Sequence, residues 1–361
     1  MARKHLISDA NPMGTDGFEF VEFASSEPQA MTALFEQLGF TAIARHRSKN
    51  VMLFRQGDIN FILNAEPSGQ AARFRQVHGP SANAMAFRVG DARAAYERAL
   101  DRGAEPAPVA ANPMELHIPA IKGIGDSALF LVDRWGEDGD IYDVDFEYFP
   151  GVDRRPKGVG LETLDHLTHN VYTGRMSVWA DFYSRLFNFR EIRYFDIEGR
   201  HTGLLSKAMT GPCGKLRIPI NESQDEKSQI AEYLRDYRGE GIQHIALSTA
   251  DIFRSVEDLR GRGVQFLKAP PETYYELLET RVPGHGEDVA RLRSNAILLD
   301  GAAPRILLQI FTEPCIGPIF FEIIQRKGDD GFGEGNFRAL FEAMEQDQIR
   351  RGTLKVAETA E

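Results

Sequence analysis

The sequence predicts an α+β fold built by duplication, with mostly antiparallel sheet and helices on the outside. Segments that are predicted as a strand followed by an amphipathic helix occur in the same order in each half of the 361 residues. A period of about 150 residues indicates a duplicated domain, because solenoid repeats are far shorter. Further strand-rich stretches follow without intervening helices, which favours antiparallel pairing: Asn50–Leu63, Ala302–Phe311 and Ile319–Gln325.

Each half begins with a strand and a helix. Phe18–Phe23 is predicted as the first strand, and Leu164–Val171 as its counterpart. The apolar residues that follow recur at helical spacing. In the first half the stripe ends near Gly39 and comprises Met31, Leu34, Phe35 and Leu38. In the second half it comprises Trp179, Phe182, Tyr183, Leu186 and Phe187.

A second pair of segments matches without a gap. The strand and turn at Ala86–Asp91 and the helix that follows to Gly103 correspond to Ala246–Asp251 and a helix to Gly263, at a constant offset of 160 residues. Asp91 and Asp251 both stand where a helix N-cap belongs, since a carboxylate accepts hydrogen bonds from the free N–H groups of a first helical turn.

The stretch Gly151–Gly160 is short, basic and rich in Gly and Pro, so we expect it to link two domains. The predicted domains are residues 1–153 and 154–361. Glycine-rich Gly331–Gly335 lacks the spacing of a dinucleotide site and is predicted as a flexible loop before a last helix, from about Asn336 to Arg351.

Charge and composition exclude several classes of function. The formal charge of −11 argues against binding to a nucleic-acid backbone, which needs clustered Lys and Arg. No apolar stretch is long enough for a signal peptide core or a membrane span. The two cysteines, Cys213 and Cys315, are too few for a disulfide framework. We therefore expect a cytoplasmic protein.

Three polar residues of the second half share strand-like, apolar surroundings: His166, His244 and Glu322. A carboxylate buried in a strand needs a partner, because an unpaired buried charge is very costly. Two imidazoles and a carboxylate around one metal would meet that need and leave coordination positions open, as in non-haem Fe(II) oxygenases. Satisfied core residues are the competing interpretation. His169 also competes with His166, because residues three apart on a strand face opposite sides.

The first half lacks the same trio. The duplication matches Ala84 to His244 and Phe20 to His166, and Glu147 is the candidate counterpart of Glu322. We therefore expect the first half to serve as a scaffold without metal, and to mediate homo-oligomerisation into a dimer or tetramer.

Across about residues 12–355 the sequence resembles the 4-hydroxyphenylpyruvate dioxygenase family. The matching blocks are Arg47–Asn50, Pro119–Gly125, Asp165–Asn170, Ala269–Pro271, Tyr274–Glu276 and Gln325–Phe337. The resemblance implies the vicinal-oxygen-chelate (glyoxalase/bleomycin-resistance-like) fold, with repeated βαβββ modules that form two open barrel-like domains. It implies His166, His244 and Glu322 as ligands of Fe(II), which decides against His169.

The resemblance also implies the pocket residues. The groups assigned to catalysis are Gln243, Gln309, Ser206 and Asn221. The groups assigned to substrate binding are Pro219, Gln229, Phe311, Phe332, Asn336, Phe337 and Phe341. Phe311 and Phe337 would hold an aromatic ring, for which core packing is the alternative. The last helix would act as a lid hinged at Gly331–Gly335.

The implied reaction uses Fe(II) and O₂ to convert 4-hydroxyphenylpyruvate into homogentisate and CO₂ in tyrosine and phenylalanine catabolism. The alternatives are 4-hydroxymandelate synthase acting on the same aromatic 2-oxo acid, an extradiol catechol dioxygenase, and a ligand-binding protein of the same fold without catalysis.

Overall fold

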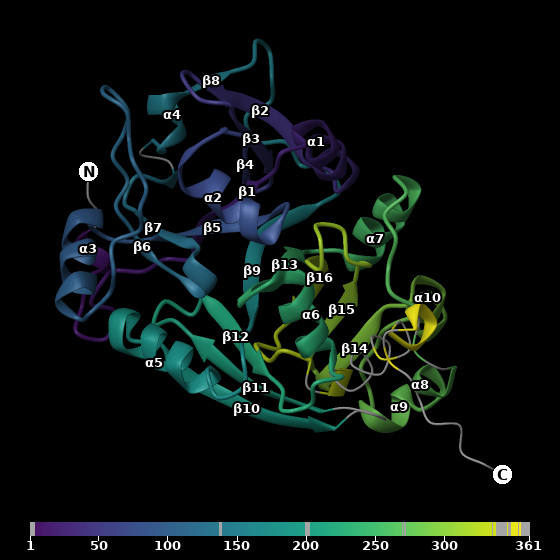
Figure 1. The fold of residues 1–361 in the computed structure, drawn as a ribbon. Coiled ribbons are helices and arrows are strands. Elements are labelled where there is room, and N and C mark those ends of the chain that lie inside the picture. Colours follow the sequence, from purple (N-terminus) through teal and green to yellow (C-terminus); the bar gives the residue numbers. More distant parts are fainter. Residues whose placement is uncertain are drawn as a thin grey trace.

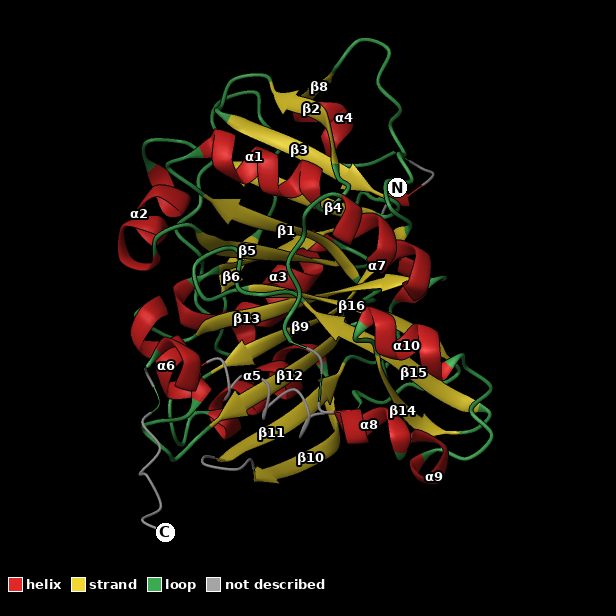
Figure 2. Ribbon diagram, turned by 90° about the vertical axis from the view of Figure 1, so that its right-hand side faces the viewer, coloured by secondary structure: helices red, strands yellow, loops and turns green. Residues whose placement is uncertain are grey.

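A computed structural model describes residues 4–136, 139–198, 203–268, 270, 272–333, 335–336, 345, 348–352 and 354. These residues form two eight-stranded sheets, one from each half of the chain (Figure 1). The strand orders are β6-β7-β5-β1-β4-β3-β2-β8 and β10-β11-β12-β9-β13-β16-β15-β14. Figure 2 shows the two sheets one above the other, with helices around them. No helix in the described ranges has the length and apolar character of a membrane span.

The first sheet contains β1 (Phe18–Ala24), β2 (Thr41–His46), β3 (Val51–Gln56), β4 (Ile59–Asn64), β5 (Ser81–Arg88), β6 (Ala120–Lys122), β7 (Ala128–Val132) and β8 (Phe146–Tyr148). Its helices are α1 (Pro28–Gln37), α2 (Gly69–His78), α3 (Ala92–Asp101) and α4 (Tyr142–Asp145). Short 3₁₀ turns occur at Lys4–Leu6 and Ile124–Asp126.

The second sheet contains β9 (Leu161–Asn170), β10 (Arg190–Glu198), β11 (Gly203–Thr210), β12 (Arg217–Glu222), β13 (Gly241–Thr249), β14 (Leu298–Ala302), β15 (Arg305–Phe311) and β16 (Phe320–Lys327). Its helices are α5 (Met176–Phe187), α6 (Gln229–Tyr237), α7 (Ile252–Gly261), α8 (Glu272–Glu276), α9 (Leu278–Arg281) and α10 (Val289–Asn295).

The predicted paired elements are confirmed. β1 with α1 and β9 with α5 are the two strand–helix units at the start of each half, and β5 with α3 matches β13 with α7. Both predicted N-caps form: the Asp91 carboxylate accepts from the backbone N–H of Ala94 at 2.9 Å, and that of Asp251 from Arg254 at 3.1 Å. These caps satisfy donors that the first helical turn leaves free.

Strand pairing repeats between the sheets. β1 and β9 each pair antiparallel with β5 or β13, which in turn pair parallel with β7 or β16. Three βαβββ modules are complete: β1 to β4, β9 to β12, and β13 to β16 with their helices α1, α5 and α7. In the remaining module, β5 and α3 are followed by β6 and β7, and no described strand corresponds to β14.

The two halves share one hydrophobic core. A single cluster of buried residues includes side chains of both sheets, and the rings of Phe61 and Phe321 lie 5.9 Å apart across the junction. The buried side chain of Gln56 connects the linker to the first half by hydrogen bonds. Its amide oxygen accepts from the backbone N–H of Val159 at 2.6 Å, and its amide nitrogen donates to the carbonyl of Leu38. The first sheet ends at Tyr148 and the second begins at residue 161, on either side of the predicted boundary.

Candidate functional site

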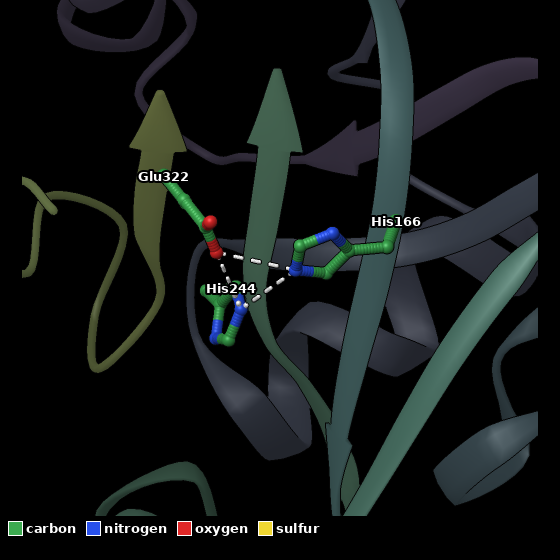
Figure 3. A group of neighbouring side chains, drawn as sticks. All are labelled: His166, His244 and Glu322. Atoms are coloured by element: carbon green, nitrogen blue, oxygen red, sulfur yellow. Dashed lines mark hydrogen bonds and ion pairs between the residues drawn. The ribbon is translucent and has the colours of Figure 1, made fainter. Parts of the chain in front are cut away.

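Three adjacent strands bring the predicted trio together. β9, β13 and β16 are neighbours in the second sheet. His166 pairs with Ala246, Ala246 pairs with Glu322, and His244 lies two residues before Ala246 on the same strand. Because directly paired residues point to the same side of a sheet, the three side chains share one face. Figure 3 shows them converging there. We call this the inner face of the second sheet.

The three ligand atoms form a nearly equilateral triangle. His166 Nε2 lies 3.2 Å from Glu322 Oε2 and 3.3 Å from His244 Nε2, and the third side measures 3.3 Å. Three ligands on one face of an octahedron with bonds of about 2.1 Å lie about 3 Å apart. All three residues are buried, and among the described residues they are the one group of His, Cys, Asp and Glu side chains close enough to share an ion. The donor set and the spacing therefore fit a divalent metal.

His169 points away from this group. Its Nε2 lies 2.7 Å from the hydroxyl of Tyr183 on α5, on the side of the sheet that helices cover. The ring is fully buried, and burial lowers the pKa of His169 to about 3. It is a neutral core residue, and the geometry selects His166 for the site.

A β-bulge precedes each histidine of the trio. In the ladder between β9 and β13, Asp165 and Gln243 are extra residues at two of the three register shifts. A bulge turns consecutive side chains toward the same face, so each of these residues lies beside the histidine that follows it. Asp165 Oδ1 lies 2.8 Å from His166 Nδ1, and Gln243 Oε1 lies 3.0 Å from His244 Nδ1. When Nδ1–H donates to these oxygens, Nε2 presents its lone pair to a metal.

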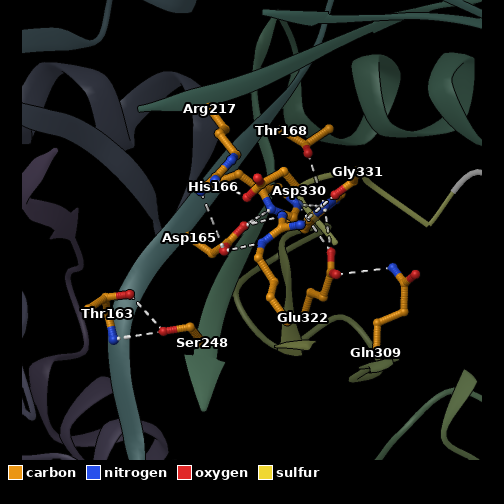
Figure 4. Close-up of polar contacts among 12 residues, drawn as sticks. Thr163, Asp165, His166, Thr168, Arg217, Ser248, Gln309, Glu322, Asp330 and Gly331 are labelled. Carbon is orange, nitrogen blue, oxygen red and sulfur yellow. Dashed lines mark hydrogen bonds and ion pairs between the residues drawn. The ribbon is translucent and has the colours of Figure 1, made fainter. Parts of the chain in front are cut away.

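Arg326 holds Asp165 in place. Its guanidinium makes two hydrogen bonds of 2.7 Å to the carboxylate and also donates to the carbonyl oxygens of Asp329 and Gly331. Arg217 lies 3.8 Å from the same carboxylate (Figure 4). This network connects the His166 side of the triangle to the loop after β16.

The pKa values of the site residues favour binding of a cation. Burial would raise the pKa of Glu322, but the imidazoles, above all His166, lower it to about 2. Burial lowers the pKa of His244. Burial opposes protonation of His166 too, yet the carboxylates of Glu322 and Asp165 outweigh it and raise that pKa. Burial would likewise raise the pKa of Asp165, but Arg326 holds it well below its usual range. A divalent ion would compete with protons for the ring nitrogen of His166.

A chain of amides fixes Glu322 on its other side. Gln309 donates to Glu322 Oε1 at 3.1 Å, and Asn336 donates to Gln309 Oε1 at 3.0 Å. The hydroxyl of Tyr274 donates to Asn336 Oδ1 at 2.6 Å. Gly333 packs directly on this chain, because a Cβ at that position would lie 1.7 Å from Gln309 Oε1. The loop before the last helix is thus part of the site.

Aromatic rings surround the triangle. Phe332 lies edge-on to His166 with ring centres 5.4 Å apart, and Phe320 stacks on His244 at 4.9 Å. Phe311 lies 6.2 Å from the His244 ring. These buried rings make the surroundings of the triangle apolar, which strengthens electrostatic interactions within it.

The structure places the remaining predicted residues in two groups. Strand register puts Ser206, Asn221, Pro219, Gln309 and Phe311 on the inner face with the trio. Gln229, the first residue of α6, lies with Gln243 in the lining of a cavity of about 510 Å³ that also contacts Phe320. The Ser206 hydroxyl and Gln229 Oε1 are buried and have no hydrogen-bond partner among the described residues. Phe337, Phe341 and most of the predicted lid helix lie outside those residues.

The first sheet carries apolar residues at the metal positions. Register matches Phe20 to His166, as predicted, because Phe20 pairs with Ala86 and His166 with Ala246. Ala84 takes the place of His244, also as predicted.

Glu147 is not the counterpart of Glu322, and that prediction was wrong. Ala86 pairs with Phe130 where Ala246 pairs with Glu322, so Phe130 holds the equivalent position. Glu147 lies on β8 at the far edge, where it pairs with Arg45. The likeness of two short Phe-Glu sequences was misleading because β8 joins β2 instead of continuing the second module.

Four further residues contact the site and were not predicted from the sequence: Asp165, Arg326, Thr168 and Phe320. Thr168 Oγ1 lies 2.9 Å from His244 Nε2. Two signals were present, since Asp165 directly precedes His166 and Arg326 stands in the longest matching block. Their contacts depend on bulges and on strand order, which a single sequence does not display.

Comparison with known proteins decides the family. A model described as "Hydroxyphenylpyruvate dioxygenase, HPPD, N-terminal" matches residues 10–147, and one described as "Glyoxalase/Bleomycin resistance protein/Dioxygenase superfamily" matches residues 163–288. A 4-hydroxyphenylpyruvate dioxygenase from Pseudomonas sp. (strain P.J. 874) is 57% identical over 349 residues, covering 95% of this chain and 98% of that protein. This chain belongs to the 4-hydroxyphenylpyruvate dioxygenase family.

The chain is also similar to a protein with a different name and to a solved structure. Hemolysin VllY from Vibrio vulnificus (strain CMCP6) is 58% identical, covering 98% of this chain and 100% of that protein. A mutant of 4-hydroxymandelate synthase from Streptomyces coelicolor superposes with a TM-score of 0.80 at 27% identity, covering 92% of this chain and 99% of that chain. The expected vicinal-oxygen-chelate fold and the enzyme class are confirmed.

Proposed function

We propose that this protein uses Fe(II) and O₂ to convert 4-hydroxyphenylpyruvate into homogentisate and CO₂. The conversion comprises oxidative decarboxylation, ring hydroxylation and migration of the side chain. The triangle of His166, His244 and Glu322 carries the proposal, because two imidazoles and a carboxylate on one face of an ion are typical of non-haem iron oxygenases. The identity to relatives named for this reaction supports it.

The residues around the triangle would hold and orient the metal. Bound there, Fe(II) would supply chelation of the 2-oxo acid and activation of O₂. Asp165 and Gln243 fix the orientation of the two imidazoles, and Gln309 fixes the carboxylate of Glu322. Preorganisation of this kind limits the reorganisation needed during the reaction.

The aromatic substrate would lie against the apolar rings of the inner face. Phe311 and Phe332 offer ring contacts on either side of the triangle. Ser206 offers a buried hydroxyl without a partner among the described residues, and Asn221 lies opposite it on β12. We propose that these two groups bind the phenol. The ring contact of Phe337 and the lid role of the last helix belong to the proposal on the resemblance alone.

4-Hydroxymandelate synthase activity is the second candidate, favoured by the structural match over nearly the whole chain. It shares the substrate and differs in the carbon that is hydroxylated. Incubation of the Fe(II)-loaded protein with 4-hydroxyphenylpyruvate and O₂, followed by mass spectrometry of the products, tests both. Homogentisate with one CO₂ per substrate is expected. 4-Hydroxymandelate would select the second candidate, and absence of iron-dependent turnover would leave a ligand-binding protein.

Variants test the ligand set in the same assay. His166→Ala, His244→Ala and Glu322→Ala should each abolish iron-dependent turnover, because a site that has lost one of its three ligands holds iron poorly. His169→Gln is the matched control, since that ring faces α5 and should leave metal binding intact. Full activity in any of the three alanine variants would remove that residue from the ligand set.

We also propose a cytoplasmic homo-oligomer, a dimer or tetramer assembled through residues 1–153. That half carries apolar residues at the metal positions, which leaves it free for a scaffolding role. Light scattering on the purified protein measures the mass, and a monomer would contradict this part of the proposal.

A further inference from the structure

On its inner face, the first sheet has polar residues at several positions that are also polar in the second sheet, although its residues at the metal-ligand positions are apolar. Asn83 is an extra residue in the ladder between β1 and β5, at the same register shift where Gln243 stands in the second sheet. Glu22 pairs with Ala84 as Thr168 pairs with His244. We call Glu22, Asn64 and Asn83 the polar trio of the first sheet.

Asn64 completes this correspondence. It pairs with Ala24 on β1 in the way that Asn221 pairs with Asn170 on β9. The polar trio of the first sheet thus stands where Thr168, Asn221 and Gln243 stand in the second. Core packing alone would favour apolar residues at such positions, as it does at Phe20 and Phe130, whose rings lie 5.6 Å apart.

The same face encloses a cavity of about 400 Å³. Apolar side chains form much of its wall, among them Phe20, Val51, Ile62 and Phe130. Its mouth lies among exposed residues, including Ser68 and the loop at 108–112. Binding sites for small molecules typically combine an apolar wall with a few placed polar groups. Here Glu22 and Asn64 of the polar trio face the cavity.

Glu22 has one carboxylate oxygen to spare. Oε1 accepts from Asn83 at 2.7 Å and from Asn64 at 3.0 Å, whereas no described residue donates to Oε2. Burial raises the pKa of this carboxyl against the opposing effects of the two amides and Lys49. The Lys49 ammonium itself pairs with Glu115 at 2.7 Å. Glu22 is therefore a partly buried carboxylate without a cation in contact among the described residues.

The cavity as a whole is acidic. Its described lining carries four carboxylates against two permanently cationic side chains, Lys49 and Arg73. The Asp145 carboxylate binds Arg47 at 3.0 Å, and Glu115 binds Lys49, whereas Glu66 accepts from the backbone N–H of Asn50. Glu22 and Glu66 are therefore the lining carboxylates that no described cationic side chain contacts, and Glu22 is the one that belongs to the polar trio.

We infer that the first sheet forms a second small-molecule site, for an aromatic or branched apolar ligand with an ammonium group that binds the Glu22 carboxylate. The bulge that places Gln243 in the catalytic half places Asn83 here, where it orients Glu22 by hydrogen bonding. The inference is independent of the reaction proposed for the iron site, because the two sites use different sheets.

Isothermal titration with 2-phenylethylammonium tests the inference on the whole protein. The expected dissociation constant is on the order of 1 mM or lower, as befits a small probe. Neutral 2-phenylethanol should bind more weakly, because it lacks the charge that the Glu22 carboxylate would attract. Glu22→Gln keeps an acceptor oxygen for Asn64 and Asn83 but removes the charge. It should therefore weaken binding of the ammonium probe at least about tenfold.

Glu66 and Ile62 of the cavity lining provide two further variants. Glu66→Gln removes a rim charge and should change affinity less than about twofold. Ile62→Phe fills the cavity and should abolish binding of the probes with Glu22 intact, and thermal unfolding verifies that each variant is folded. A wild-type protein that does not bind the ammonium probe, a Glu22→Gln variant that binds it equally well, or equal affinity for 2-phenylethanol would overturn the inference.

Discussion

Asp165 and Gln243 each stand immediately before a histidine of the metal triangle and contact its Nδ1 atom. One is a carboxylate held by Arg326, and the other is a neutral amide. The two imidazoles are therefore not equivalent. An ionised partner makes His166 the stronger electron donor, since a carboxylate that accepts from Nδ1–H raises the basicity of Nε2.

Replacement of Asp165 by Asn should weaken metal binding about 10- to 100-fold, the usual effect of losing a partner behind a ligand. The amide keeps the shape and an acceptor oxygen but loses the charge and leaves Arg326 unpaired. Competition between the protein and a chelator for Co(II) measures the affinity without turnover. Asp330→Asn is the control, because that carboxylate is 89% exposed and contacts only the outer side of the network through Arg217. Equal affinities in the two variants would count against a role for Asp165.

At the scale of elements, the loop from Gly328 to Asn336 ties the end of β16 to the site. Arg326 donates to two of its carbonyl groups, Phe332 packs on His166, and Asn336 holds Gln309. The backbone of Gly333 is left-handed, with φ of 74°, and no side chain fits between it and Gln309. Glycine is required there for both reasons.

Gly333→Ala should therefore lower turnover by at least about tenfold, because the new methyl group pushes Gln309 away from Glu322 and displacements of about 1 Å at a reacting centre are costly. Steady-state kinetics with the proposed substrate measures the effect. Gly214→Ala provides the comparison: its φ is 71°, and nothing lies within 4 Å of the added Cβ. It introduces the same backbone strain without the collision, so its turnover should stay near that of the parent protein. Similar losses in both variants would point to strain alone.

Bulges are the second decisive feature at this scale. Strict alternation would point Gln243 away from His244, and the extra residue at the register shift reverses that. The same device recurs at Asn83 in the first sheet. An alternating sequence pattern with a period of two residues does not show where such a bulge occurs.

At the scale of the whole molecule, the two sheets are joined through buried side chains. Phe61 faces Phe321 and Phe87 faces Phe187 across the junction, with ring centres 5.9 and 5.1 Å apart. Gln56 bonds the linker from within. If one half unfolded alone, the other half would expose much of this shared core to water. That exposure costs free energy in proportion to the apolar area.

We expect both halves to unfold in a single transition, although chains of this length often unfold by domains. The two tryptophans report on each half separately, since Trp135 belongs to the first and Trp179 to the second. Denaturant titrations of Trp179→Phe and Trp135→Phe, followed by the fluorescence of the remaining tryptophan, should show the same midpoint as circular dichroism. Two separated midpoints would show that each half is stable alone.

The sequence by itself determined the duplication, the paired strand–helix units, the N-caps at Asp91 and Asp251, and the candidacy of His166, His244 and Glu322. These features are local, because periodicity, capping and residue type act within a few positions of the chain. The residue pattern left His166 and His169 open, the family resemblance favoured His166, and the tertiary structure placed it in the site. Only the tertiary structure replaced Glu147 by Phe130 as the counterpart of Glu322 and joined Asp165 to Arg326. Those outcomes depend on which strands are neighbours and where a bulge shifts the register, and both are set by long-range packing.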